Sequence, residues 1–137
     1  MRGWPAVLLV LAACGSSEKG PPPLRHLSLS YSYVIRPDDA PPHARQDINY
    51  TIKIVDAKTR QPIENGEGQI FFKNRDGAGN WDGFVYGPEV GTYHAKISFV
   101  TSGLWAMGIR FRRDSLHPLE RIDWMQDVLD EKPSNVP

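Results

Sequence analysis

Alternating hydrophobic and polar residues between positions 91 and 112 form the clearest pattern in the chain. Every second residue is hydrophobic over 91–99, and the pattern resumes over 105–111 after a Thr-Ser-Gly break at 101–103. A period of two is typical of a strand with one buried face. We therefore predict two strands joined as an antiparallel hairpin. A lone hairpin is marginally stable in water, so the rest of the chain must cover its hydrophobic face.

Several shorter segments repeat this alternation. It predicts one strand over residues 25–36, a second centred on 48–54, a third over 69–73 that is covered on both sides, and a fourth over 84–86. Pro, Asp and Gly residues separate these segments, and residues 74–83 form a glycine-rich connection. Residues 116–136 fit either a helix or a strand. We favour a final edge strand, because the preceding strand needs a partner.

These elements predict an all-β fold without a long helix. About seven short strands separated by turns are typical of an immunoglobulin-like antiparallel β-sandwich. We expect this domain to span residues 25–130, with a C-terminal tail over 131–137. An internal disulfide is excluded because Cys14 is the only cysteine, so packing must hold the sheets together. The predicted core consists of Tyr31, Tyr50, Ile52, Phe71, Tyr93, Phe99 and Trp105.

The N-terminus has the pattern of a secretion signal. A short basic start precedes an apolar run over residues 4–13, which is too short to span a bilayer. The run ends in Leu11-Ala12-Ala13-Cys14, which resembles the lipobox of bacterial lipoproteins. The resemblance implies a signal peptide over residues 1–13 and acyl chains, such as palmitate, on Cys14. A signal peptide with an incidental cysteine is the alternative reading.

Residues 14–24 follow as a flexible linker rich in Gly, Ser and Pro. Several acyl chains on one residue give stable membrane anchoring. Gly15 follows the cysteine, whereas an aspartate there would indicate retention at the inner membrane. The resemblance therefore favours an outer-membrane lipoprotein whose folded domain faces the periplasm or the cell surface.

The charge balance and the absence of catalytic motifs argue against nucleic-acid binding and against catalysis. Sixteen basic and sixteen acidic residues balance, and no basic run indicates a nucleic-acid partner. The chain has no Gly-x-Ser-x-Gly elbow, and its adjacent carboxylates Asp38 and Asp39 lie in a proline-rich turn rather than in a predicted pocket. We expect a non-enzymatic protein that needs no cofactor.

Metal-ligating residues are scattered along the chain. His26, His43, His94 and His117 form no closely spaced pair, and we assign Met107 to the core and His94 to a solvated strand face. Copper sites use clustered imidazole or soft ligands, so the spacing does not indicate one. The glycine-rich connection also contains four oxygen-bearing side chains that are candidate calcium ligands: Asn74, Asp76, Asn80 and Asp82. The alternative is that these residues only form turns.

Trp81 lies in the same glycine-rich connection and is the candidate partner-binding residue. An aromatic side chain at a loop tip can anchor a partner. It can also fold back over the edge of the sandwich. Binding of a small ligand or glycan is a third possibility, which depends on Trp81 alone.

Three segments resemble the YtkA-like and FixH-like domains: IVDAKTRQPIENGEGQIFF at 54–72, GTYHAKISF at 91–99 and GLWAMGIRF at 103–111. The resemblance covers about residues 47–113. It implies a small non-enzymatic β-sandwich facing the extracytoplasmic space, and its FixH side implies copper delivery or oxidase assembly. FixH-like proteins carry a membrane-spanning helix, where this chain has a lipid signal. The matching positions are Asp56, Pro62, Gly91, Tyr93, Gly103 and Trp105.

The sequence thus favours a lipid-anchored, periplasm-facing binding or scaffolding module with a protein partner in the cell envelope. The alternative is a copper-handling or oxidase-assembly accessory protein of the YtkA or FixH type.

Overall fold

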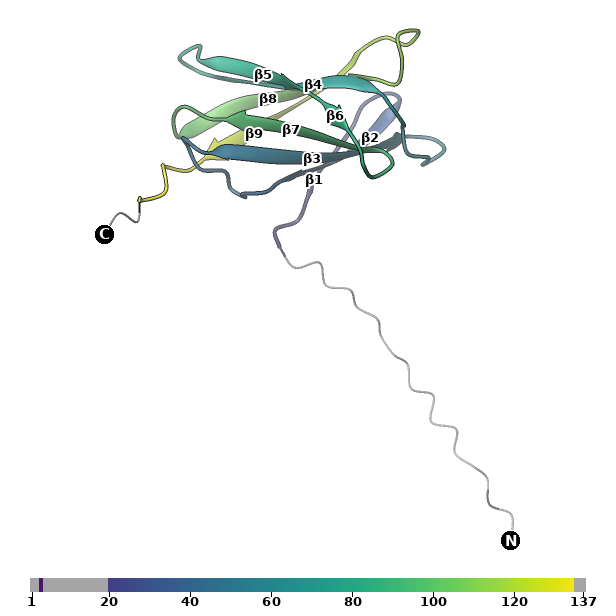
Figure 1. Ribbon diagram of the computed structural model, residues 1–137, viewed down its shortest axis with the longest axis horizontal. Helices are drawn as coiled ribbons and strands as arrows, with labels where there is room; N and C mark the ends of the chain where they lie inside the picture. The colour runs from purple at the N-terminus through teal and green to yellow at the C-terminus, as the bar shows by residue number, and fades with distance from the viewer. Residues whose placement is uncertain (1–2, 4–19, 135–137) are drawn as a thin grey trace.

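The computed structural model describes residue 3 and residues 20–134, which fold as nine β-strands without a helix. The predicted signal peptide and Cys14 lie outside the described residues, except for Gly3. A candidate membrane-spanning helix is not found among the described residues. The predicted all-β antiparallel sandwich is confirmed (Figure 1).

Two antiparallel sheets form the sandwich. The first has the order β1-β2-β3-β7-β6, and the second has the order β5-β4-β8-β9. The strands of the first sheet are β1 (Leu24–Leu27), β2 (Tyr31–Pro37), β3 (Asp47–Asp56), β6 (Val85–Tyr86) and β7 (Thr92–Ser98). Those of the second are β4 (Glu67–Asn74), β5 (Gly79–Gly83), β8 (Gly103–Arg112) and β9 (Glu120–Val128).

The core fills the space between the inner faces of the two sheets. Its largest fully buried side chains are aromatic, and several meet edge-to-face, as Tyr31 and Phe111 do with ring centroids 4.9 Å apart. Such pairs add stability beyond the area that they bury. Six of the residues predicted for the core are buried: Tyr31, Tyr50, Ile52, Tyr93, Phe99 and Trp105.

Phe71 is the exception and was wrongly assigned to the core. Its neighbours Ile70 and Phe72 point inward, so the alternation of a strand turns Phe71 to the outer face. The guanidinium carbons of Arg110 and Arg121 lie 5.2 and 4.7 Å from the centre of its ring. The third predicted strand is therefore buried on one face only, and cation–π contacts cover part of the other.

The predicted hairpin over residues 91–111 is also wrong. Strand β7 pairs with β3 and β6 in the first sheet, whereas β8 pairs with β4 and β9 in the second. The break at 101–103 therefore carries the chain from one sheet to the other. Both strands still bury one face, because the two inner faces of a sandwich oppose each other.

Two other segments differ from the prediction. The single strand expected over 25–36 is a hairpin of β1 and β2, whose turn leaves Leu29 89% exposed. The glycine-rich connection contains the edge strand β5, which pairs with β4. The predicted final edge strand is confirmed as β9, which pairs with β8.

Candidate functional site

His26 and Trp124 meet where the edge strands of the two sheets approach each other. His26 belongs to β1 and Trp124 to β9, and their ring centroids lie 5.6 Å apart. Trp124 is buried, and His26 is half-buried. Since β1 and β9 belong to different sheets, this contact closes one side of the sandwich.

Both rings carry a buried nitrogen without a hydrogen-bond partner. Within residues 20–134, neither Nε2 of His26 nor Nε1 of Trp124 has a donor or acceptor in reach. An unsatisfied buried polar atom costs about 1–3 kcal/mol. Native structures therefore rarely contain one without a bound water or ion. A bound water or another polar group between the sheets would satisfy both atoms, as it would the buried hydroxyls of Tyr50 and Thr92, which also lack a partner among the described residues.

Met107 lies next to Trp124 in the strand register and carries a thioether sulfur. It is the cross-strand partner of Trp124 on the inner face of the second sheet, and its side chain is buried. We name His26, Met107 and Trp124 the His26 site. Imidazole and thioether groups are the ligand types that suit monovalent copper. Two of the three side chains therefore carry donor types that suit a copper ion.

No spacing or motif in the sequence indicates the His26 site. Its residues lie on three different strands. The pairing of β8 with β9 makes Met107 and Trp124 neighbours, and the packing of β1 against β9 brings His26 to Trp124. Met107 lies in the core, as the alternation of its strand predicts. Packing alone explains a methionine at that position, so the sequence does not indicate that it could be a ligand. An orphaned nitrogen is visible only once the packing is known.

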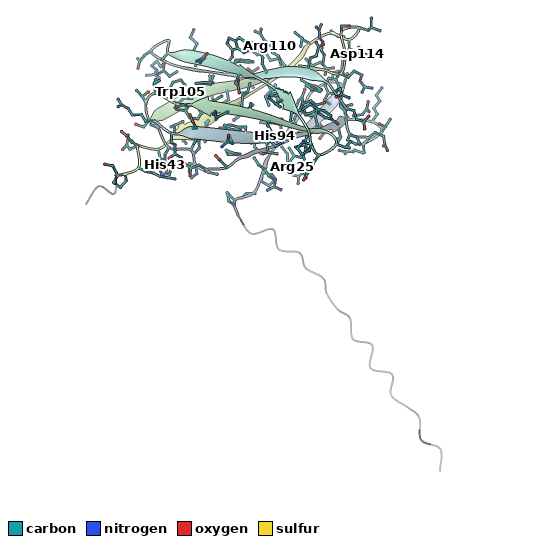
Figure 2. The ribbon with its side chains drawn as sticks, viewed as in Figure 1. Arg25, His43, His94, Trp105, Arg110 and Asp114 are labelled. Carbon is teal, nitrogen blue, oxygen red and sulfur yellow. The ribbon has the colours of Figure 1, made fainter. Side chains whose placement is uncertain are left out.

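The other histidines lie apart from this site and from one another. His43 lies near the C-terminal end of the described chain, His94 lies on β7, and His117 pairs with Asp114 at the opposite end of the sandwich (Figure 2). In the part of the chain that the structure describes, no group of three or more His, Cys, Asp or Glu residues could hold a metal ion. A site built from several histidines is therefore not formed here.

Asp39 organises the loop between β2 and β3. Its carboxylate accepts hydrogen bonds from the Nδ1 atom and backbone N–H of His43, at 2.7 and 3.1 Å, and from Gln46. Lys132 reaches its other oxygen at 3.4 Å. Burial raises the pKa of Asp39, but hydrogen bonds from His43 and Lys132 outweigh that effect and hold the pKa below its ordinary value. The arrangement ties the loop to the C-terminal segment.

The four candidate calcium ligands do not form a common site, because they either accept hydrogen bonds from the backbone or lie far from one another. The Oδ1 atom of Asn74 accepts the backbone N–H of Ala78 in the β4–β5 turn. Asp82 accepts the backbone N–H of Lys96. Asp82 pairs with Ile70, four residues along β4 from Asn74, which is about 13 Å at 3.3 Å per residue.

The remaining two calcium candidates do not complete a cage. Asn80 accepts the backbone N–H of its neighbour Trp81, and Asp76 lies exposed in the turn. The structure therefore does not gather the four side chains around one point.

Trp81 lies on edge strand β5 rather than at a loop tip. It is 61% exposed and is the cross-strand partner of Phe71. The side chain does not fold back into the sandwich. Trp81, Phe71, Arg110 and Arg121 share the outer face of the second sheet, and we call them the aromatic–arginine patch.

The sequence matches no protein-family model and no curated protein. Solved structures that resemble the fold include the following two proteins. A DUF4426 family protein from Pseudomonas aeruginosa PAO1 has a TM-score of 0.62 and 8% identity, and the match covers 80% of this chain and 97% of that protein. A copper-bound variant of FetP from uropathogenic Escherichia coli strain F11 has a TM-score of 0.56 and 12% identity, with 85% and 97% covered. At these identities the likeness shows a shared β-sandwich fold and nothing more.

Proposed function

We propose that this protein is a non-catalytic copper-handling accessory protein of the extracytoplasmic space. The observation that carries the proposal is the buried, unpartnered Nε2 atom of His26 beside Trp124, whose cross-strand partner is Met107. The copper-bound FetP variant, whose fold is similar, supports it. So does the resemblance of residues 47–113 to the YtkA-like and FixH-like domains.

His26 and Met107 would hold the ion, and Trp124 would cover it. An imidazole nitrogen and a thioether sulfur favour monovalent copper over divalent metals that prefer oxygen. The surrounding apolar side chains would limit the access of water, and a dry shell is one way in which proteins tune a metal site. Storage or transfer of the ion requires no further reactive group.

A competition titration with monovalent copper tests the proposal. The protein to use is the full chain with Cys14→Ser, which removes the only thiol; we call it the unlipidated chain. We expect one copper ion per chain, held against a chromogenic chelator. His26→Ala and Met107→Leu should each weaken binding by at least tenfold.

His94→Ala is the matched control, because His94 lies on the outer face of β7 and should leave binding unchanged. Absence of stoichiometric binding to the unlipidated chain would contradict the proposal, and so would equal weakening by His94→Ala. Circular dichroism of each variant separates a lost ligand from a lost fold.

We propose further that Cys14 carries the lipid anchor and that the domain is held at the outer membrane by it. The lipobox-like Leu11-Ala12-Ala13-Cys14 supports this assignment. Cells expressing the native chain and grown with labelled palmitate should incorporate label into the protein, and Cys14→Ser should abolish the incorporation. Label retained in the variant would contradict lipidation at this residue.

Partner binding is the second candidate function, and the aromatic–arginine patch favours it. Exposed tryptophan and arginine residues are enriched among the residues that dominate binding energy at protein interfaces. In this reading the domain holds another envelope protein through the outer face of the second sheet. A photo-crosslinking amino acid at position 81 should capture one defined partner in whole cells, whereas the same group at Lys53, on the other sheet, should capture none.

A further inference from the structure

A hollow of about 690 Å³ lies at one end of the outer face of the second sheet. Its rims are the β4–β5 turn and the break between β7 and β8, and its floor is formed by β8 and β9. This volume lies within the range of about 300–1,000 Å³ that is typical of small-molecule sites. The hollow is separate from the His26 site, which lies on the inner faces.

The strand register explains the hollow. Lys73, Ala106 and Met125 are successive cross-strand neighbours on β4, β8 and β9. The methyl group of Ala106 leaves a low point between two long side chains. Leu104 lies two residues before Ala106 on the same strand face. Leu104 and Met125 are 55% and 58% exposed, so the floor presents apolar surface to solvent.

Both rims are fixed before any ligand binds. In the β4–β5 turn, Asn74 accepts the backbone N–H of Ala78 through Oδ1 at 2.9 Å and donates its own N–H to the Ala78 carbonyl at 2.8 Å. On the other rim, Nε1 of the buried Trp105 donates to the Thr101 carbonyl at 3.0 Å. A preformed site loses less conformational entropy on binding than a mobile one.

The charges around the hollow favour an anion. Lys73 and Arg75 line it, and neither forms an ion pair with any residue of 20–134. Asp76 is the acidic residue among the lining side chains. Two cations without carboxylate partners next to an apolar floor complement a molecule with one anionic head and one apolar chain.

We infer that this hollow binds an amphipathic anion of the fatty-acid class as a free monomer. The carboxylate lies at Lys73 and Arg75, and the alkyl chain runs over Ala106 between Leu104 and Met125. This activity is independent of copper handling, because none of its residues belongs to the His26 site. Free fatty acid and the anionic surface of a bilayer share this chemistry, and the experiment distinguishes them.

A nuclear magnetic resonance titration of the unlipidated chain with sodium dodecanoate, below its micelle concentration, tests the inference. We expect saturable shifts in the amide signals of residues 73–76, 101–106 and 125. Lys73→Glu combined with Arg75→Glu should weaken binding at least tenfold, and Ala106→Leu, which fills the floor, should do the same. Lys53→Glu is the matched control on the other sheet and should leave the affinity unchanged.

Dodecanol and vesicles of anionic phospholipid complete the test. Dodecanol lacks the carboxylate and should bind at least tenfold more weakly than dodecanoate. Equal binding of dodecanol, shifts centred away from the hollow, or binding to the vesicles but not to monomeric dodecanoate would each overturn the inference.

Discussion

The carboxylate of Asp82 accepts the backbone N–H of Lys96 at 2.8 Å. Asp82 belongs to β5, at the edge of the second sheet, and Lys96 belongs to β7 of the first sheet. Strand β6 covers the edge of β7 at His94 and Tyr93 only. A side chain from one sheet therefore satisfies a backbone donor that the short strand β6 leaves open, and joins the two layers at this edge.

Removal of this carboxylate should destabilise the sandwich modestly. Asp82→Ala leaves the Lys96 N–H to solvent, so we expect a loss of about 0.5–1.5 kcal/mol in the free energy of unfolding. Urea denaturation of the unlipidated chain measures this change. Asp76→Ala is the matched control in the neighbouring turn and should change stability by less than about 0.5 kcal/mol. Equal losses in the two variants would show that the cross-sheet bond contributes nothing specific.

Gly91 should not tolerate a side chain. Its φ angle is +71°, and an added Cβ would lie 2.5 Å from the Cβ of Pro62. The left-handed conformation alone costs a non-glycine residue about 1–2 kcal/mol, and an overpacked contact costs about 1–3 kcal/mol more. Gly91→Ala should therefore lower the free energy of unfolding by more than Gly77→Ala does.

Gly77 is the matched control because its φ angle is +87° and nothing lies within 4 Å of an added Cβ. The difference between the two alanine variants measures the Pro62 contact. A Gly91→Ala loss no larger than that of Gly77→Ala would contradict the close approach.

Truncation of a buried and of an exposed tryptophan should change the stability of the protein to very different extents. Trp105 is buried between Phe72 and Phe99, with ring centroids 5.7 and 5.3 Å away. Trp105→Ala should cost about 3–5 kcal/mol. Trp81 is exposed on an edge strand, and Trp81→Ala should change stability by about 0.5 kcal/mol at most. Chemical denaturation of both variants measures the contrast, and a small loss for Trp105→Ala would remove this residue from the core.

Acid should weaken the fold partly through Asp56. Its carboxylate accepts the backbone N–H groups of Thr59 and Lys58 and pairs with Arg113 at 2.6 Å, and these contacts lower the pKa of Asp56 to about 2. An unfolded aspartate titrates near pH 3.9. The unfolded chain therefore binds the proton first, and the stabilisation is present above about pH 4 and lost as the pH falls toward 2.

The free energy of unfolding, measured in urea between pH 2 and pH 6, tests the direction of this pH dependence. The unlipidated chain should lose more stability between pH 4 and pH 2 than its Asp56→Asn variant, which cannot titrate at this position. Asp130→Asn, an exposed control, should follow the parent chain. Parallel curves for the parent and Asp56→Asn would contradict the linkage.

Periodicity predicted which residues are buried more reliably than which strands pair. Phe99 and Trp105 are buried and in contact, as the alternation requires. The same alternation fits a hairpin or a crossing between two sheets, because both bury one face of each strand. Which of the two forms depends on the strand that pairs with β7. That strand is β3, about forty residues earlier in the chain, so a local pattern does not reveal the pairing.

The residues that carry the resemblance to YtkA-like and FixH-like domains have a structural explanation. Gly91 packs against Pro62, and the hydroxyl of Tyr93 donates to the Ile63 carbonyl at 2.6 Å. These contacts join β7 to the segment between β3 and β4. The motif therefore encodes this packing. The His26 site lies outside it except for the segment containing Met107, which is why the motif alone could not reveal the site.

X-ray absorption at the copper edge of the copper-loaded, unlipidated chain identifies the ligands of the proposed copper site. We expect a monovalent ion with one nitrogen and one sulfur neighbour, supplied by His26 and Met107. The sulfur signal should disappear in Met107→Leu and persist in Met125→Leu, whose methionine is exposed on the outer face. A spectrum with only oxygen and nitrogen neighbours, or a sulfur signal unchanged in Met107→Leu, would show that Met107 does not bind the ion.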